Sequence, residues 1–377
     1  MIARTRAIAK KEVKQLSRDK RMLFVIFFFP VFLLGIFGYA VNFDVHHIKI
    51  AVYDQDKTDQ SRSIVESLIS SDYFDYVKTI KSENEIKTIL DEKDAQIVLV
   101  IPKNFSRDIY SKKNAELQYL IDGVDGNTAT IIYNYVTAAT ADFSNNFQNE
   151  IFARYGIKPY KPIDLQAIFW FNPDLKSTRF LIPGLIAMIL IVTSVISVSL
   201  SLVREKEKGT IEQINVSSLN TLELLIGKAL PYVIISLINA TFIILAGYLL
   251  FGVYVHGSLL LLFISTLIFI IASISLGIFI SVIAETQQIA FTFATFSTLL
   301  PSVILSGFIF PIESMPLPIQ ILTNITPAKF FIVALRAIML RGVGLSAFWT
   351  QLVYLILFIC LFLGLATIVN RKKMKNA

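Results

Sequence analysis

Charge is what this 377-residue chain has little of. Charged residues make up 17% of it and hydrophobic residues 54%, where a soluble protein has about 25% charged residues. Residues 229–284 contain no Asp, Glu, Lys or Arg at all, and that run is too long for a single membrane crossing. Only helices and closed barrels satisfy their backbone groups in lipid. The apolar runs are continuous, unlike the short alternating segments of a barrel, so we predict a polytopic α-helical membrane protein.

Cysteine and histidine are nearly absent as well. The chain has one cysteine and three histidines. Because Cys360 is the one cysteine, an intrachain disulfide and a thiolate metal cluster are excluded, and it lies inside an apolar run. His46 and His47 are adjacent, and we favour a plain loop beside the membrane over a metal-binding pair. We therefore predict no metal site.

A nucleotide-binding loop is also missing from the sequence. Lys228 follows a glycine, but Ala229 stands where a P-loop has Ser or Thr, and Leu222 stands in place of its first glycine. A P-loop needs that glycine for close backbone approach to phosphate and the hydroxyl for magnesium. We expect no catalytic residues and no cofactor bound by this chain.

Six membrane spans follow from the apolar runs. The N-terminal segment 1–21 and the tail 371–377 are rich in Lys and Arg, which predicts cytoplasmic termini. This distribution argues for a topology signal and against nucleic-acid binding. The charged loop 204–228 would then lie on the same side, with its charges in water. The predicted spans are residues 22–41, 180–203, 229–251, 258–284, 289–312 and 348–369.

Residues 42–178 have the composition of a folded domain inserted between the first two spans. Residues 48–53, 95–101 and 116–121 read as strands, the last at a sheet edge. Residues 61–69, 84–90 and 125–150 read as helices. We predict an extracytoplasmic α/β or α+β domain, followed by a transmembrane domain over 179–370.

Residues 313–341, between the fifth and sixth predicted spans, have mixed character. They are apolar but carry Lys329 and Arg336 and follow several prolines. A charge at the bilayer centre is costly, so we expect an outer re-entrant or amphipathic segment and not a seventh span.

The polar residues that we consider within the predicted spans are Ser, Thr and Asn239. Small hydroxyl residues mostly support close helix packing, which we favour over the lining of a pathway. The absence of acidic and basic side chains from the predicted crossings argues against an ion-coupled carrier. The candidates for a pathway are Ser194, Ser197, Ser201, Asn239, Thr295 and Ser302.

Several stretches resemble ABC-2 type transporter permeases. They are REKEKGTIEQ at 204–213, LLIGKALPY at 224–232, KEVKQ at 11–15, RDKR at 18–21, LSGFIFPIESMP at 305–316, and residues 326–342. Their order spans nearly the whole chain, and the large domain at 42–178 is similar to the drug-efflux-like branch. Lys20 departs from the proline that many relatives carry there.

The resemblance implies the transmembrane subunit of an ATP-binding-cassette exporter in a bacterial inner membrane. Two copies of a separate ATPase, with ATP and Mg, would drive it, and a second permease, identical or paralogous, would complete the pathway. A periplasmic adaptor is a further implied partner, and the cargo would be small and amphiphilic or drug-like. Segment 1–21 would lie along the inner membrane surface.

Two groups of residues take roles from the resemblance. Composition alone leaves the loop at 204–228 as either a solvated turn or a contact for a partner. The resemblance assigns ATPase coupling to Arg204, Glu205, Glu207, Gly209, Thr210 and Glu212. It assigns an outer gate to Pro311, Glu313 and Pro316.

Two other functions remain open from the residues. A channel or secondary carrier without a motor would need ionisable groups or a constriction along its pore. A membrane-anchored sensor would use the inserted domain to bind a ligand, but it would not need six spans.

Overall fold

The computed structural model describes residues 2–18, 20–40, 47–71, 73–111, 115–154, 170–171, 176–209 and 221–376. The chain divides into two compact units. The membrane unit comprises Met1–Asn42 and Ile168–Ala377, and the sheet unit comprises Phe43–Ala167.

The sheet unit is built on a four-stranded sheet of order β2-β1-β3-β4. β1 pairs in parallel with both β2 and β3, and β4 pairs antiparallel with β3 at one edge. Parallel neighbours need a crossover, which α3 and α4 supply. The strands are β1 (Ile48–Asp54), β2 (Phe74–Thr79), β3 (Ile97–Ile101) and β4 (Gln118–Ile121).

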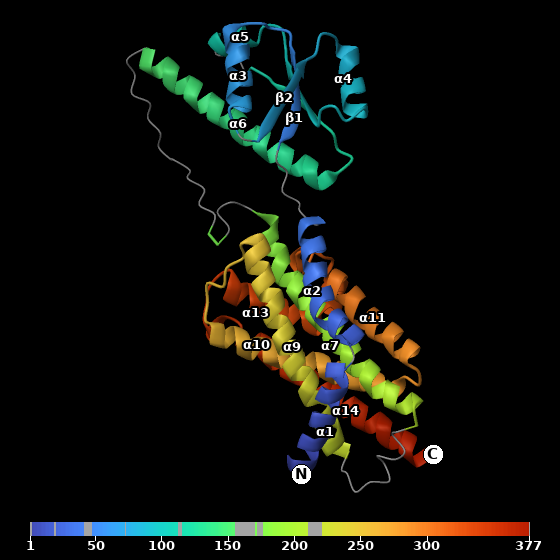
Figure 1. Ribbon diagram of the computed structural model, residues 1–377. Helices are drawn as coiled ribbons and strands as arrows, with labels where there is room; N and C mark the ends of the chain where they lie inside the picture. The colour runs from blue at the N-terminus through green and yellow to red at the C-terminus, as the bar shows by residue number, and fades with distance from the viewer. Residues whose placement is uncertain are drawn as a thin grey trace. The chain divides into compact units, whose positions relative to one another are not determined.

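Helices cover both faces of this sheet (Figure 1). α3 (Asp59–Ile69), α5 (Phe105–Tyr110) and α6 (Gly126–Arg154) pack on the face that carries Ile50 and Leu99. α4 (Glu83–Asp91) packs on the face that carries Ala51 and Val98. Successive strand residues point to opposite faces, so the continuous apolar strands β1 and β3 supply both cores.

The membrane unit is helical. α7 lies at its centre and packs against α2, α9, α10, α11 and α13, while α10 also packs against α14. The helices are α1 (Ile2–Arg18), α2 (Lys20–Ala40), α7 (Ser177–Glu207), α9 (Thr221–Phe251), α10 (Leu259–Ile283), α11 (Gln287–Ile304), α12 (Leu317–Leu322), α13 (Pro327–Met339) and α14 (Trp349–Asn376), with 3-10 turns η1 (Ile312–Ser314), η2 (Thr323–Ile325) and η3 (Leu345–Ala347).

Four of the described helices are long and apolar enough to cross a membrane, namely α7, α9, α10 and α14. The first predicted span corresponds to α2, in which the apolar helical part is Ile26–Ala40. The fifth corresponds to α11, which begins with polar Gln287 and ends at Ile304, short of the predicted residue 312. The structure thus shows a polytopic helical membrane protein, and the count of six spans stays a prediction.

The segment predicted to be re-entrant is bent. The helical stretch Leu317–Ile325 meets α13 at an angle of 92°, and the two together would count as a fifth, broken span or as a re-entrant loop. The break falls at Thr326, which is extended with φ −97° and ψ 126°. A residue before proline is disfavoured in the helical region, so Pro327 accounts for the bend and begins α13.

Candidate functional site

Glu205, in the last turn of α7, is a buried carboxylate whose cationic partners come from two other helices. Lys11 Nζ of α1 lies 3.0 Å from Glu205 Oε1, and the Glu205 side chain is 7% exposed. Lys228 Nζ of α9 faces Glu205 Oε2, and the Lys228 side chain is 4% exposed. A buried charge is costly unless it is paired. These three residues therefore depend on one another and join α1, α7 and α9.

Glu12 adds a second buried carboxylate beside this group. Glu12 is 2% exposed, and the Ser201 hydroxyl of α7 lies 3.4 Å from Glu12 Oε2, to which it donates a hydrogen bond. We call Lys11, Glu12, Ser201, Glu205 and Lys228 the Glu205 cluster. The expectation that the charges of the 204–228 loop lie in water is wrong for Glu205 and Lys228. α1 packs against α9, and Lys11 of α1 forms an ion pair with Glu205 inside the protein.

Lys206 and Glu207 bind the ends of the next two helices. Lys206 Nζ donates to carbonyl oxygens at the end of α10, among them that of Ala284 at 3.3 Å. Glu207 Oε1 accepts the backbone N–H of Gln287 at 2.6 Å, and Oε2 accepts the Gln287 side-chain amide. A cation at a helix C-terminus and a carboxylate at an N-terminus satisfy unpaired backbone groups and match the helix dipole. Lys206 and Glu207 thus connect the end of α7 to the turn between α10 and α11.

Gly209 and its neighbours complete the predicted coupling segment. Gly209 has a φ of +66°, which glycine adopts without the penalty of a side chain. Its N–H donates to the Lys206 carbonyl at 3.0 Å, which closes the end of α7. Arg204 is half-buried. Thr210 and Glu212 lie outside the described residues.

The predicted pathway residues do not form one group. The Ser194 hydroxyl of α7 lies 3.0 Å from the Ser236 hydroxyl of α9, with both side chains buried, and donates to it. That contact supports the packing interpretation. Ser201 belongs to the Glu205 cluster, and Ser197 is half-buried. Within the described part of the chain, a buried polar atom lacks a hydrogen-bond partner in each of Asn239, Thr295 and Ser302.

The predicted gate residues Pro311, Glu313 and Pro316 are exposed and lie in and beside η1. In the same region the structure shows part-buried contacts of Arg336 in α13, a residue for which the sequence analysis proposed no role. Arg336 Nη2 donates to the Phe180 carbonyl at 3.1 Å and to the Phe308 carbonyl at 3.4 Å. Its guanidinium also lies 3.7 Å from the centre of the Phe180 ring, a cation–π contact.

Comparison with known proteins decides the family. The family described as "ABC-2 family transporter protein" matches residues 20–368. The chain belongs to this family. The probable multidrug ABC transporter permease YbhR of Escherichia coli K12 is 31% identical over 93% of this chain and 94% of its own length. The probable multidrug ABC transporter permease YbhS is 30% identical over 98% and 97%, and the inner membrane transport permease YhhJ is 27% identical over 90% of each.

As an ABC-2 permease, this chain is a membrane subunit of an ABC transporter and needs a partner that hydrolyses ATP. The sequence analysis identified the segment but missed several of the residues that meet there. Lys11 and Glu12 lie in the KEVKQ stretch that contributed to the resemblance, and Lys228 is the last residue of the predicted loop 204–228. No coupling role was assigned to these three residues individually. Lys206 was not among the predicted coupling residues, although it lies between Glu205 and Glu207.

Proposed function

We propose that this ABC-2 permease exports a small amphiphilic or drug-like molecule from the cytoplasm or the inner leaflet. The family membership and the names of two relatives as probable multidrug permeases support this cargo class. The motor is a separate ATPase, present in two copies, which binds ATP and Mg. Its movement enters the permease through the end of α7 and the residues that follow it.

The observation that carries the coupling proposal is the convergence of helices on the end of α7. Glu205 ties α7 to α1 and α9, while Lys206 and Glu207 tie it to the ends of α10 and α11. A displacement of this end is therefore shared with four other helices at once. Charged hydrogen bonds suit this task because they fix orientation as well as distance. Arg204, Gly209, Thr210 and Glu212 belong to the same proposed coupling segment.

The arrangement in the membrane follows from the same proposal. The protein is a multi-pass protein of a bacterial inner membrane, consistent with the name of the inner membrane transport permease YhhJ. Six spans place both basic termini in the cytoplasm and the sheet unit outside it. A second permease, identical or paralogous, completes the pathway. Two similar permeases from one organism, YbhR and YbhS, support a paralogous pair. Pro311, Glu313 and Pro316 lie at the outer gate, and an adaptor would meet the sheet unit.

Co-purification tests the proposal. An ATPase encoded beside this permease should copurify with it, together with either a second tagged copy or a paralogue. Its ATP hydrolysis should rise when amphiphilic cargo is added to the lipid-reconstituted complex. Cargo flux through the purified permease alone, without ATP or ATPase, would instead establish a channel or secondary carrier.

A further inference from the structure

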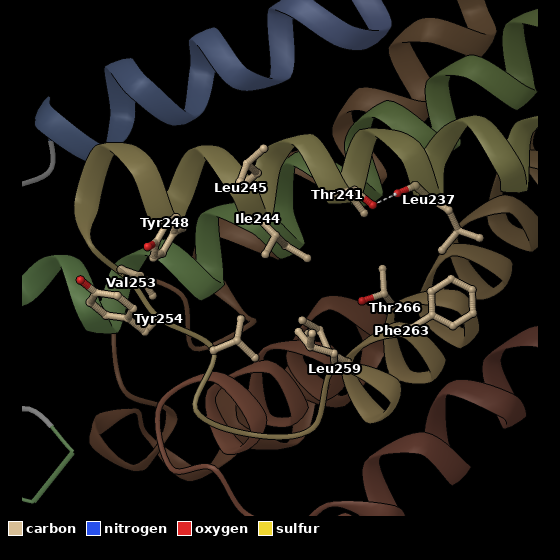
Figure 2. Close-up of a pocket in the computed structure, with 13 residues that line it drawn as sticks. Leu237, Thr241, Ile244, Leu245, Tyr248, Val253, Tyr254, Leu259, Phe263 and Thr266 are labelled. Atoms are coloured by element: carbon tan, nitrogen blue, oxygen red, sulfur yellow. Dashed lines mark hydrogen bonds between the residues drawn. The ribbon is translucent and has the colours of Figure 1, made fainter.

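A cavity lies between α9 and α10 in the membrane unit, beside the loop that connects them (Figure 2). Its volume is about 470 Å³, within the range of about 300–1,000 Å³ that small-molecule sites occupy. All thirteen residues drawn around it belong to the described part of the chain, and none of them is charged. A charged ligand would lack a counter-charge there, so the cavity suits an uncharged one.

The loop that connects α9 and α10 is anchored to α13 by backbone hydrogen bonds. The backbone N–H of His256 donates to the Met339 carbonyl at 3.1 Å, and that of Gly257 donates to the Ile338 carbonyl at 3.0 Å. A Cβ atom at position 257 would lie 2.7 Å from the Ile338 oxygen, so only glycine permits this approach. The loop is therefore docked on α13, and it holds Tyr254 over the cavity.

The cavity opens on an apolar surface. Leu245, Leu259 and Phe263 line it and are exposed, and exposed apolar side chains on membrane-spanning helices face lipid. At the loop end, the rings of Tyr248 and Tyr254 pack edge to face with centroids 5.2 Å apart. Tyrosine is enriched where a membrane meets water. A ligand would therefore reach the cavity from the bilayer, beside its interface.

Thr266 indicates that the ligand has a polar group that can form a hydrogen bond. This residue of α10 lines the cavity and is 3% exposed. Within the described part of the chain, its buried hydroxyl oxygen has no hydrogen-bond partner. Thr241, opposite on α9, differs because its hydroxyl donates to the Leu237 carbonyl at 3.0 Å. A buried hydroxyl left unpaired is unfavourable, and a plain hydrocarbon chain would leave it so.

We propose that this cavity binds a compact, uncharged amphiphile from the bilayer. The apolar body of the ligand fills the space between α9 and α10, and a carbonyl or amide group pairs with Thr266. This inference deepens and rests on the proposed function, since it gives the exporter a site for its class of cargo. The acyl chain of a resident phospholipid is the competing occupant, and it would not pair with Thr266.

Two photoreactive probes test this assignment on the full-length permease in lipid nanodiscs. One is an alkyl diazirine that bears a single amide, and the other is the matched alkyl diazirine without the amide. Both should label peptides of α9 and α10. Thr266→Val should weaken binding of the amide probe about fivefold, the loss of one hydrogen bond, and should leave the alkyl probe unchanged. Thr266→Ser keeps a hydroxyl and should retain the preference for the amide.

Ser265→Ala is the matched control. Ser265 is the neighbouring residue of α10, and its buried hydroxyl also lacks a partner within the described residues, but it does not line the cavity. The variant should bind both probes like the unmodified protein. Equal effects of Thr266→Val on both probes, equal effects of the two variants, or labelling elsewhere would overturn the assignment. A copurified phospholipid that neither probe displaces would also overturn it.

The outcomes for the site and for the proposed function can be separated. ATP-driven transport without labelling of α9 and α10 would reject this site alone. Labelling that depends on Thr266, in a protein that transports without any ATPase, would keep the site and reject the proposed function.

Discussion

The sheet unit and the membrane unit place their charges in opposite ways. In the sheet unit, apolar residues fill both faces of the sheet, and an ion pair such as Arg62–Asp59 has side chains 68% and 93% exposed. In the membrane unit, large apolar side chains such as Phe28 and Leu259 are exposed, while Glu12, Glu205 and Lys228 are buried. An exposed charge in the sheet unit is stabilised by water without a partner, whereas a buried charge in the membrane unit needs a partner of opposite charge.

This difference teaches where charge is informative. A charged residue in the sheet unit says little beyond solubility, because water solvates it. A buried charge in the membrane unit needs a specific partner, so each one marks a contact between helices. The Glu205 cluster is one such contact, at the end of α7, and the half-buried Arg336 makes a similar one beside the beginning of α7.

The largest effect expected is from Glu205→Ala. Removal of this carboxylate takes away the group that pairs directly with buried Lys228 and with Lys11, which should destabilise the membrane unit by about 3–5 kcal/mol. Thermal unfolding of the detergent-solubilised protein measures it. The control is Asp59→Asn in the exposed pair of the sheet unit, which should change stability by less than about 0.5 kcal/mol. Similar small losses for both variants would mean that the two units treat charge alike.

Leu99→Ala should produce the next largest effect, this time in the sheet unit. Leu99 is fully buried at the centre of the sheet, and truncation of a buried leucine costs about 2–5 kcal/mol. Limited proteolysis should show cleavage within residues 43–167 at a lower temperature, while the membrane unit stays intact. Loss of both units together would show that they do not unfold separately.

Arg336→Met should destabilise the membrane unit by about 1–3 kcal/mol. The variant removes the charged donor of the hydrogen bonds to the carbonyls of Phe180 and Phe308, and the loss of hydrogen bonds from a charged group costs about that much. Arg341→Met is the matched control, because Arg341 is exposed and should be close to neutral. Unfolding temperatures of the two variants would be compared, and a neutral Arg336→Met would remove this contact from the account.

Glu207→Lys should have the smallest effect on folding but a large one on transport. Glu207 is exposed and binds the start of α11 through Gln287. Membrane insertion should be normal, while cargo-stimulated ATP hydrolysis by the complex should fall several-fold. Glu285→Lys reverses another exposed charge in the same turn and should change hydrolysis little. Adding Gln287→Glu to Glu207→Lys should restore part of the activity. Equal activity of the two single variants would contradict a coupling role for Glu207.

The sequence predicted those parts of the fold that depend on local pattern. β1 and β3 follow from short continuous apolar runs, α3 and α4 follow from helical spacing of apolar residues, and β4 and α6 also correspond to predicted segments. β2 was not predicted because Phe74 is its only buried residue, which leaves no alternation to read. α9, α10 and α14 follow from runs without charge.

The sequence predicted the position of the candidate site at the end of α7 but not the residues from other helices that meet there. The REKEKGTIEQ stretch marked the end of α7, but Lys11 and Glu205 are separated by 194 positions in the chain. Nothing in a local window shows that α1 returns to cover Glu205. Arg336 was visible as a cation in an apolar helix, yet its partners come from the beginning of α7 and the turn after α11.

The central claim is that this permease moves cargo only when a separate ATPase drives the end of α7. Transport of a fluorescent amphiphile in proteoliposomes tests it most directly, with the permease alone and with its copurified ATPase. We expect flux only with both proteins and ATP, and a several-fold lower flux with Glu207→Lys. Equal flux without the ATPase or without ATP would contradict the account.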